Sequence, residues 1–308
     1  MQSATPQTPK RIISPSARRA ARRRLLMGLA FVSPWLLGFF IFTLYPVIAS
    51  FRYSLTVYPV LHPPRYVGFE NYRQLLTGDK YFWRYAVLNT VFMFLELPLG
   101  IGMGLALATL LNQRLKGMAA FRAMLYLPSV VPAVASAMLW MWIFNPQYGL
   151  ANSVLTAVHL PKLNWLVDPR WSKPSLIIMD VWGVGGGMII TLAALQGVPK
   201  HLYEAATLDG ASAFGRFRHV TIPMISPVLF FQLIMGVIGT FQYFTNAQVM
   251  TKGGPQMSTT YYAYYLFNNA FVYFKMGYAC AMAWILFAIT LSLSLLVMWS
   301  GKKWVHYG

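Results

Sequence analysis

The chain has 308 residues, of which 57% are hydrophobic and only 10% are charged, so it is too apolar for an average soluble domain. Its net charge of +18 would indicate a nucleic-acid partner in a soluble protein. Here the basic residues lie in loops beside long apolar blocks, so anionic lipid head groups are the better partner.

The apolar residues are gathered in six blocks rather than spread along the chain. Each block holds more than twenty residues, which is enough to cross a hydrocarbon core about 30 Å thick. The sequence therefore predicts an all-α, polytopic membrane protein with six transmembrane helices. The blocks are Leu26–Ala49, Tyr85–Leu111, Ala123–Phe144, Ser175–Gln196, Ile222–Val249 and Met276–Ser300.

Residues 1–24 form a basic tail with no acid, directly before the first block. Cytoplasmic segments of membrane proteins carry an excess of Lys and Arg, and the first helix usually dominates the orientation. With this tail inside, the inner segments hold 15 of the 25 basic residues. We therefore expect a membrane domain over residues 25–300, a second tail at 301–308, and both termini in the cytoplasm.

The first three blocks carry prolines or a carboxylate. Pro34 and Pro46 lie in the first block, where each favours a kink. Pro128 and Pro132 lie four residues apart in the third block, where they are expected to break successive turns of one face. Glu96 lies in the second block, and a carboxylate inside a membrane is a functional candidate by default.

The fourth block contains a second carboxylate, Asp180, and a glycine-rich run, VWGVGGGM, at Val181–Met188. For Asp180, as for Glu96, hydration or a hydrogen bond between helices is the alternative to a transport role. The glycine run lies in an apolar block with no Lys-Ser/Thr pair after it. That context excludes a phosphate-binding loop.

Between the fourth and fifth blocks lies a mostly polar insert, residues 197–223. Pro199 is interpreted as a first-turn proline, and Lys200–Leu208 is predicted to be a short helix that ends at Gly210. A second short helix is expected from Ala211 until Pro223 interrupts it. The small residues at this corner would let a partner protein approach the backbone closely, whereas the alternative is an ordinary loop helix.

The second half of the fifth block is unusually polar. Thr240 and Tyr243 are expected to share one helix face, with Gln242 and Asn246 on the adjacent face. Uncharged polar side chains at that depth either hold helices together or line a path for a polar ligand.

The motifs together resemble the permease subunits of bacterial ABC importers. The insert resembles their EAA loop, in Glu204-Ala205-Ala206, Asp209-Gly210-Ala211, Phe217, Ile222-Pro223 and Pro227. Further sequence motifs are similar to those of the carbohydrate-uptake branch, which includes the maltose, glycerol-phosphate and oligosaccharide permeases. These are GFENY at Gly68–Tyr72, LPSVVP at Leu127–Pro132, FNPQYGLAN at Phe144–Asn152, LQGVPKHLYEAA at Leu195–Ala206 and GGP at Gly253–Pro255.

The resemblance implies a type I ABC importer permease fold in a bacterial cytoplasmic (inner) membrane. It implies a second, related permease subunit, an ATPase subunit dimer and an extracytoplasmic solute-binding protein that delivers a sugar. The chain has no G-x-x-x-x-G-K-[ST] loop, so ATP and Mg are expected on the partner ATPase, with no cofactor and no enzyme activity here. The residues expected to couple to the ATPase are Glu204, Ala205, Ala206, Asp209, Gly210 and Ala211.

The resemblance also implies a substrate pathway, in which aromatic faces stack on sugar rings and polar side chains bond hydroxyls. For each of its residues, helix packing is the alternative role. We expect an oligosaccharide as substrate, and an ion-coupled secondary transporter or a non-transporting membrane scaffold as alternatives. The five scattered histidines show no metal-ligand spacing. The expected pathway residues are Ser129, Trp182, Gly183, Gly187, Thr240, Gln242, Tyr243 and Asn246, with Ala133 and Gly236 at matching motif positions.

Overall fold

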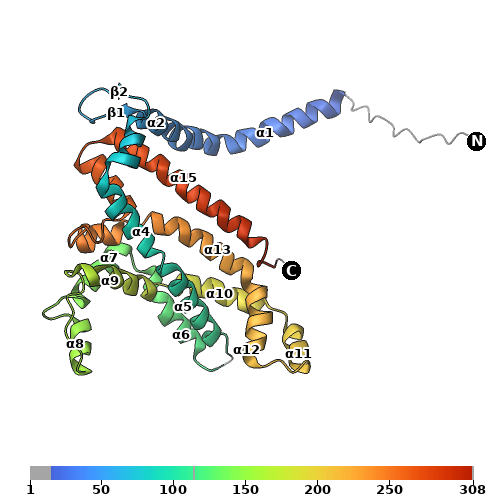
Figure 1. Cartoon of the computed structure of the whole chain (residues 1–308). Helices are drawn as coiled ribbons and strands as arrows, with labels where there is room; N and C mark the ends of the chain where they lie inside the picture. Colours follow the sequence, from blue (N-terminus) through green and yellow to red (C-terminus); the bar gives the residue numbers. More distant parts are fainter. Residues whose placement is uncertain (1–14, 114, 307–308) are drawn as a thin grey trace, which may run out of the picture. The chain divides into compact units, whose positions relative to one another are not determined.

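The computed structural model describes residues 15–113 and 115–306, with side chains from residue 22 onward. Residues 1–14 of the predicted basic tail therefore lie outside the described residues. The described residues fall into two units, which divide between Tyr53 and Ser54. Figure 1 shows the helices of both units, coloured along the sequence.

The first unit is one long helical run. It contains α1 (Pro15–Phe39), a π-helical turn η1 (Phe40–Leu44) and most of α2 (Tyr45–Ser54). Helix α1 begins inside the predicted tail and continues through Pro34 without a break. The apolar side chains point outward along this run, as a helix that meets hydrocarbon requires.

The second unit is almost entirely helical, with one two-stranded antiparallel ribbon of β1 (Thr56–Val57) and β2 (Arg65–Tyr66). Its helices up to residue 197 are α3 (Glu70–Arg73), η2 (Gln74–Gly78), η3 (Phe82–Val87), α4 (Leu88–Met93), α5 (Glu96–Leu111), α6 (Met118–Val130), α7 (Ala133–Ile143), α8 (Leu150–Ala157), α9 (Pro169–Trp182) and α10 (Gly185–Gly197). The remaining helices are α11 (Lys200–Leu208), α12 (Ala213–Arg216), η4 (Phe217–Thr221), α13 (Ile222–Phe241), η5 (Ala247–Thr251), α14 (Tyr262–Phe267), η6 (Asn268–Val272) and α15 (Met276–Gly301).

Four of the described helical runs are long and apolar enough to cross a membrane, and six are if each of two bent pairs counts as one span. The four are Arg22–Ser54, Phe82–Leu111, Ala213–Phe241 and Met276–Gly301. The bent pairs are α6 with α7, at 99°, and α9 with α10, at 44°. The all-α, polytopic fold predicted from the sequence is confirmed.

Two predicted spans have a different shape in the structure. The third block is not one helix, because the backbone leaves the helical region at Val131 and Pro132 and turns by 99°. Pro128, in contrast, stays inside α6, so the expected break at both prolines is wrong for this one. The fifth block does not run to Val249, because α13 ends at Phe241.

Pro227 lies inside α13 without ending it, and a neighbouring hydroxyl explains why. A helix proline deprives the carbonyl four residues earlier of its amide donor. Here that carbonyl belongs to Pro223, and the Ser226 hydroxyl donates to it over 2.6 Å. The freed carbonyl therefore keeps a partner, and the helix continues.

Helix α10 is the centre of the second unit, since it packs against α5, α6 and α13. Helix α13 also packs against α15. The close approach of α10 to α6 depends on glycine, because a Cβ on Gly185 would lie 2.8 Å from Tyr126 Cα and closer still to the Leu125 carbonyl oxygen. Small residues at such crossings are the usual means of packing helices in membranes.

The segment between α7 and α9 folds around one buried amide, Asn152, whose side chain has four hydrogen bonds. Its nitrogen donates to the carbonyl oxygens of Pro146 (3.0 Å) and Leu163 (2.9 Å). Its oxygen accepts from the Leu163 amide and from Trp165 Nε1, both at 3.0 Å. Asn152 is 1% exposed, so its side chain is a buried polar centre beside the apolar cluster that contains Phe144 and Trp165.

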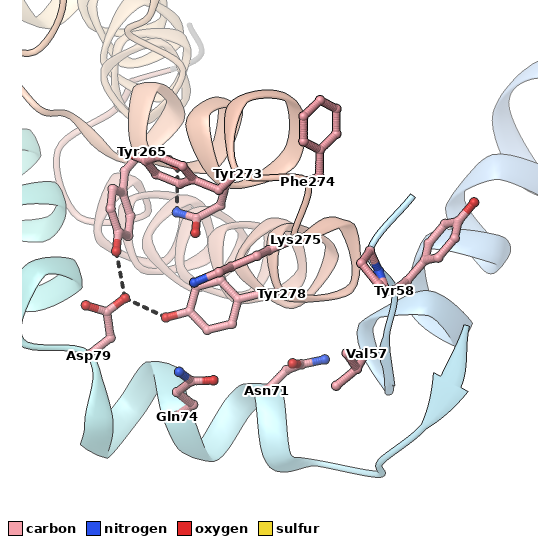
Figure 2. A pocket seen from close by; sticks show the side chains of 12 residues that line it. Val57, Tyr58, Asn71, Gln74, Asp79, Tyr265, Tyr273, Phe274, Lys275 and Tyr278 are labelled. Atoms are coloured by element: carbon pink, nitrogen blue, oxygen red, sulfur yellow. Dashed lines mark hydrogen bonds between the residues drawn. The ribbon is translucent and has the colours of Figure 1, made fainter. Parts of the chain in front are cut away.

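Residues 54–81 and 252–275 form what we call the loop layer, which Asp79 joins to α15. Asp79 Oδ2 accepts hydrogen bonds from the hydroxyls of Tyr265 (2.8 Å) and Tyr278 (2.6 Å), as Figure 2 shows. Asp79 Oδ1 accepts from the backbone amides of Tyr81 (2.9 Å) and Phe82 (3.0 Å). The pKa of Tyr265 is raised, because burial disfavours the phenolate and the hydroxyl donates to a carboxylate.

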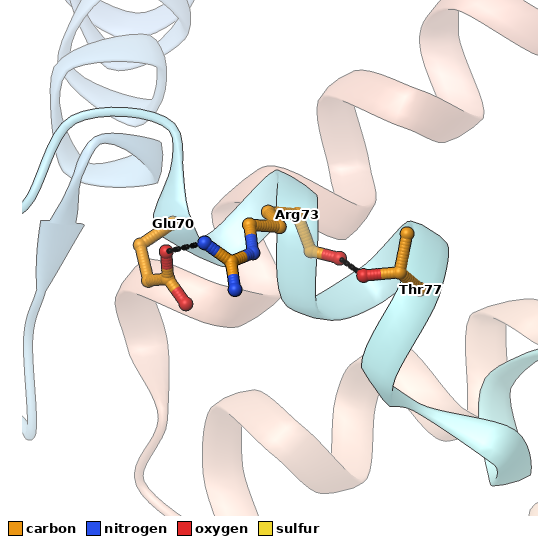
Figure 3. Close-up of polar contacts among 3 residues, drawn as sticks. All are labelled: Glu70, Arg73 and Thr77. Atoms are coloured by element: carbon orange, nitrogen blue, oxygen red, sulfur yellow. Dashed lines mark hydrogen bonds and ion pairs between the residues drawn. The ribbon is translucent and has the colours of Figure 1, made fainter.

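The same layer contains the helical run of α3 and η2, one face of which is exposed and is shown in Figure 3. Arg73 Nη1 lies 4.0 Å from Glu70 Oε2, one helical turn apart, and the Thr77 hydroxyl donates to the Arg73 carbonyl over 2.8 Å. Both charged side chains are well exposed to solvent, so this ion pair contributes little to stability.

Candidate functional site

The polar insert folds into a helical corner whose geometry follows from Gly210. The predicted helix Lys200–Leu208 is present as α11, but Pro199 precedes it in an extended conformation and is not in its first turn. Gly210 has φ +78°, which an L-residue rarely adopts. The Gly210 amide then donates to the Thr207 carbonyl (3.1 Å) and the Ala211 amide to the Ala206 carbonyl (2.9 Å). These two bonds form a Schellman motif, which ends the helix.

After the corner the chain returns through α12. The Ser212 hydroxyl accepts from the Gly215 amide over 3.1 Å, which caps this helix. Arg216 Nη1 donates to the Thr207 hydroxyl and to the Ala211 carbonyl, both at 3.2 Å, and so fastens the returning helix to α11. The expectation that Pro223 ends this helix is wrong. The helical run continues through the π-helical turn η4 into α13, and Pro223 lies in the first turn of α13.

The corner presents small and charged residues to solvent. Of the six predicted coupling residues, Glu204, Ala205, Asp209 and Gly210 are exposed, whereas Ala206 and Ala211 are half-buried. The sequence reasoning missed two apolar side chains at this corner, Leu208 and Phe214, which are 89% and 70% exposed. The signal available for them was an apolar residue in an otherwise polar insert. Exposed apolar side chains beside a small-residue corner are typical of a docking surface.

The corner is tied to the long helix that follows it. The Tyr203 hydroxyl on α11 and the Thr221 hydroxyl, at the start of α13, lie 3.0 Å apart. Tyr203 also packs against the apolar cluster formed by α5, α10 and the foot of α13. These two contacts join α11 to the start of the long α13 helix.

A shallow, open cleft of about 430 Å³ lies between α5, α10 and α13. Gly187 and Gly236 line it, and Gly236 makes room for the Leu97 side chain, which fills the space that a Cβ there would need. Glu96 and Gln232 supply polar side chains. Gln232 Nε2 donates to the Gly187 carbonyl (3.0 Å) and to the Thr191 hydroxyl (2.9 Å). Gln232 was missed in the sequence, although a lone amide in an apolar helix is a recognisable signal.

A polar cluster lies at the bend between α9 and α10. Asn246 Nδ2 donates to Asp180 Oδ1 over 3.0 Å and to the Tyr243 hydroxyl over 3.3 Å. Among the atoms that the structure describes, Asp180 Oδ2, Asn246 Oδ1 and the Tyr261 hydroxyl are buried without a hydrogen-bond partner. Buried polar atoms are rarely left unpaired, so this cluster has hydrogen-bonding capacity for a polar ligand or water. The sequence reasoning did not single out Tyr261.

Trp182 and Gly183 lie at the same bend. Trp182 is the last residue of α9 and contacts Trp140 edge to face, with ring centroids 5.7 Å apart. Gly183 follows it as the cap residue. With Tyr243 and Asn246, the structure thus gathers four of the eight predicted pathway residues around one bend, and a fifth, Gly187, lines the cleft.

The other three predicted pathway residues lie apart from this group. Thr240 is buried and its hydroxyl donates to the Gly236 carbonyl within α13. Gln242 is exposed and caps the end of α13, so the expected shared helix face of Gln242 and Asn246 is wrong. Ser129 is exposed and its hydroxyl donates to the Tyr126 carbonyl within α6.

A second, larger cavity of about 540 Å³ lies in the loop layer around Asp79, and its lining is shown in Figure 2. No residue predicted for the site lines it. Within the described part of the chain, no group of three or more His, Cys, Asp or Glu side chains is arranged to hold a metal ion.

A family described as binding-protein-dependent transport system inner membrane component matches residues 97–304. The chain is 38% identical to the probable ABC transporter permease protein YesP of Bacillus subtilis, over 94% of each chain. It is 33% identical to the trehalose/maltose transport system permease protein MalF of Thermococcus litoralis, over 91% of this chain and 95% of that one. The fold is similar to a chain of a bacterial alginate ABC transporter, crystallised with an alginate pentasaccharide-bound periplasmic protein. That likeness has a TM-score of 0.81 at 23% identity, and it covers 92% of this chain and 96% of the other.

Proposed function

The chain belongs to the family of binding-protein-dependent transport system inner membrane components, and on that premise we propose that it carries a sugar into the cytoplasm as part of an ATP-driven importer. It is a multi-pass ABC transporter permease and not itself an enzyme. A sugar is supported by the trehalose/maltose permease among its relatives. An oligosaccharide is supported by the open side of the cleft, which leaves room for a chain of several sugar rings.

The observation that carries this proposal is the connection between the exposed corner and α13. An ATPase subunit dimer binds the corner at Glu204 and at the small residues around Gly210. Closure of that dimer on ATP moves α11, and the contact between the Tyr203 and Thr221 hydroxyls passes the movement to α13. Because α13 also forms a wall of the cleft, the movement reshapes the cleft, which is rigid-body alternating access.

The sugar passes along the cleft and the bend of α9 and α10. The face of Trp182 stacks on the C–H-rich face of a sugar ring, and the unpaired oxygens of Asp180 and Asn246 accept hydrogen bonds from its hydroxyls. The cleft is shallow and open on one side, so a second, related permease subunit supplies the opposite wall. A solute-binding protein delivers the sugar from outside.

The orientation follows from the basic segments. The tails 1–24 and 301–308 and the corner lie in the cytoplasm, and the loop layer faces the binding protein. Family membership favours ATP-driven transport over the ion-coupled alternative. The scaffold alternative is separated by the experiment below.

The coupling role is tested by charge reversal at Glu204, with Glu70 as a matched control, since both are exposed carboxylates on short helices. Cells that carry Glu204→Lys are expected to lose sugar uptake, measured with labelled trehalose, maltose and longer oligosaccharides. They are also expected to lose co-purification of the ATPase subunit with this chain. Cells that carry Glu70→Lys are expected to keep co-purification of the ATPase subunit, because Glu70 lies in the loop layer and not at the corner. If Glu204→Lys leaves uptake and co-purification unchanged, the coupling role is wrong. If deletion of the chain leaves uptake intact, the transport function itself is wrong.

A second pair of variants tests the shape of the corner. Alanine at Gly210 has open space but must adopt φ +78°, which costs about 1–2 kcal/mol. Alanine at Gly197 also has open space, without a positive φ. Gly210→Ala is therefore expected to lower ATP-dependent uptake, whereas Gly197→Ala leaves it near the wild-type rate.

A further inference from the structure

A cavity of about 580 Å³ lies where α5, α6 and α10 end or begin and where α11 starts. Helix α5 ends at Leu111, α6 begins at Met118 and α10 ends at Gly197. Because the ends of these apolar helices mark the edge of the hydrocarbon region, the cavity lies at a membrane–water interface. It is separate from the cleft and from the polar cluster at the bend.

The lining of this cavity is positively charged. Arg122 and Lys200 line it, and no Asp or Glu does. Arg122 Nη2 donates to the Leu111 carbonyl over 2.8 Å, and Arg122 Nε has no partner among the described residues. The one ion pair within 4.0 Å that the described chain contains is Arg73–Glu70, so neither cation is neutralised there. Lys200 is also the first residue of α11, where the helix dipole adds positive potential.

The remaining lining is half polar and half apolar. The side-chain amides of Asn112, Gln113 and Gln196 can donate hydrogen bonds, whereas Leu115, Met118, Leu195 and Val198 form an apolar wall. A small, fully hydrated anion would gain no favourable contact with the apolar wall. In a phospholipid, the phosphate can bind the cations and amides while the acyl chains contact the apolar wall. Basic pockets between membrane helices are known to suit such head groups.

We propose that this cavity binds the phosphate of an anionic phospholipid head group, with Arg122 and Lys200 as its cationic contacts. The first turn of α11 forms part of the wall, through Lys200 and Tyr203. A bound lipid therefore contacts the first turn of α11 and stabilises the position of the corner to which the ATPase is proposed to bind. The proposed lipid site does not depend on whether the transported substrate is a sugar.

The experiment uses the full-length chain, purified in detergent and mixed with phosphatidylglycerol, phosphatidylcholine or inorganic phosphate. Native mass spectrometry measures the retained lipid, and thermal unfolding measures the shift in Tm. Wild-type protein is expected to retain phosphatidylglycerol and to gain Tm with it, but not with phosphatidylcholine. One cation near a head group contributes about fivefold in affinity, so Lys200→Gln is expected to weaken retention about fivefold, and Arg122→Gln at least as much.

Lys116→Gln is the matched control, because Lys116 is a lysine as exposed as Lys200, lies between α5 and α6 beside the lining residue Leu115, and does not itself line the cavity. It is expected to retain lipid as the wild type does. The Lys200 side chain makes no hydrogen bond to the described residues, so Lys200→Gln is expected to fold. It therefore still tests the proposal if Arg122→Gln does not fold.

Three results would overturn the proposal. The first is equal retention of phosphatidylcholine and phosphatidylglycerol. The second is an equal Tm shift with inorganic phosphate, which would assign the site to a free anion. The third is loss of ATPase co-purification in Lys200→Gln with lipid retention unchanged, which would make the cavity a protein contact.

Discussion

Replacement of Gly185 by alanine tests the packing of the helix at the centre of the second unit. The new Cβ would lie 2.8 Å from Tyr126 Cα and closer to the Leu125 carbonyl oxygen, whereas real Cβ contacts stay above 3.0 Å. Both opposing atoms belong to the backbone of α6, so no side-chain rotation can relieve the clash. Helices α6 and α10 must therefore move apart.

Overpacking of this kind costs about 1–3 kcal/mol. Gly186→Ala is the matched control, because it makes the same chemical change one residue later and its Cβ would meet only Ser129 Cβ, at 4.0 Å. Alanine also recovers up to about 0.5–1 kcal/mol of backbone entropy in a helix at either position. The free energies of unfolding of the two variants should therefore differ by about 2 kcal/mol, with Gly185→Ala the less stable.

Equilibrium unfolding in mixed SDS and dodecyl maltoside micelles, followed by circular dichroism, measures this difference. Gly186→Ala should unfold with the wild type or at a slightly higher SDS fraction. If the two variants unfold at the same SDS fraction, the close approach of α10 to the α6 backbone does not exist in the protein in solution, and our account of this crossing is wrong.

Two further predictions concern local hydrogen bonds. Asn152→Ala leaves the buried Trp165 Nε1 and three half-buried backbone groups without their Asn152 partner, so it should lower the free energy of unfolding by about 3 kcal/mol, visible as a large loss of Tm. Ser212→Ala removes the cap on α12 and should cost about 1 kcal/mol, with faster amide hydrogen exchange confined to the corner and no change around Asn152.

Local chemistry made the corner predictable from the sequence. A helix that ends at a glycine with positive φ needs only a few neighbouring residues, and both the Lys200–Leu208 helix and the Gly210 turn were found where expected. The apolar blocks were equally visible, because hydrocarbon requires about twenty apolar residues in a row. These features depend on little beyond the segment itself.

The behaviour of the prolines could not be predicted in this way. Pro227 and Pro132 each remove one helix hydrogen bond, yet α13 continues through Pro227 whereas α6 and α7 meet at 99° around Pro132. At Pro227 the freed Pro223 carbonyl accepts from the Ser226 hydroxyl inside the helix. At Pro132 the freed Pro128 carbonyl accepts instead from the Val131 amide, in the tight turn that ends α6. Residue spacing alone does not show which of these partners each carbonyl takes.

The polar group at the bend was only partly predictable for a similar reason. Tyr243 and Asn246 were identified by residue type, but a helix was assumed where the chain turns after Phe241. After this turn, Asn246 reaches Asp180, which is 66 residues away in the sequence. Tyr261 comes from a third segment. Such a cluster is created by tertiary contacts, which periodicity alone does not contain.

The order of the loop layer has a consequence for the strength of the proposed contact with the binding protein. Besides the contacts of Asp79, Asn89 Nδ2 donates to the carbonyls of Met257 (2.8 Å) and Thr260 (3.2 Å), and the Tyr262 amide donates to the Thr90 hydroxyl (2.9 Å). The loops are thus ordered before any partner arrives. A docking protein would not have to immobilise them, and each side chain already held saves about 0.5–1.5 kcal/mol of ordering entropy. Even a small, transient contact with this surface can then be specific.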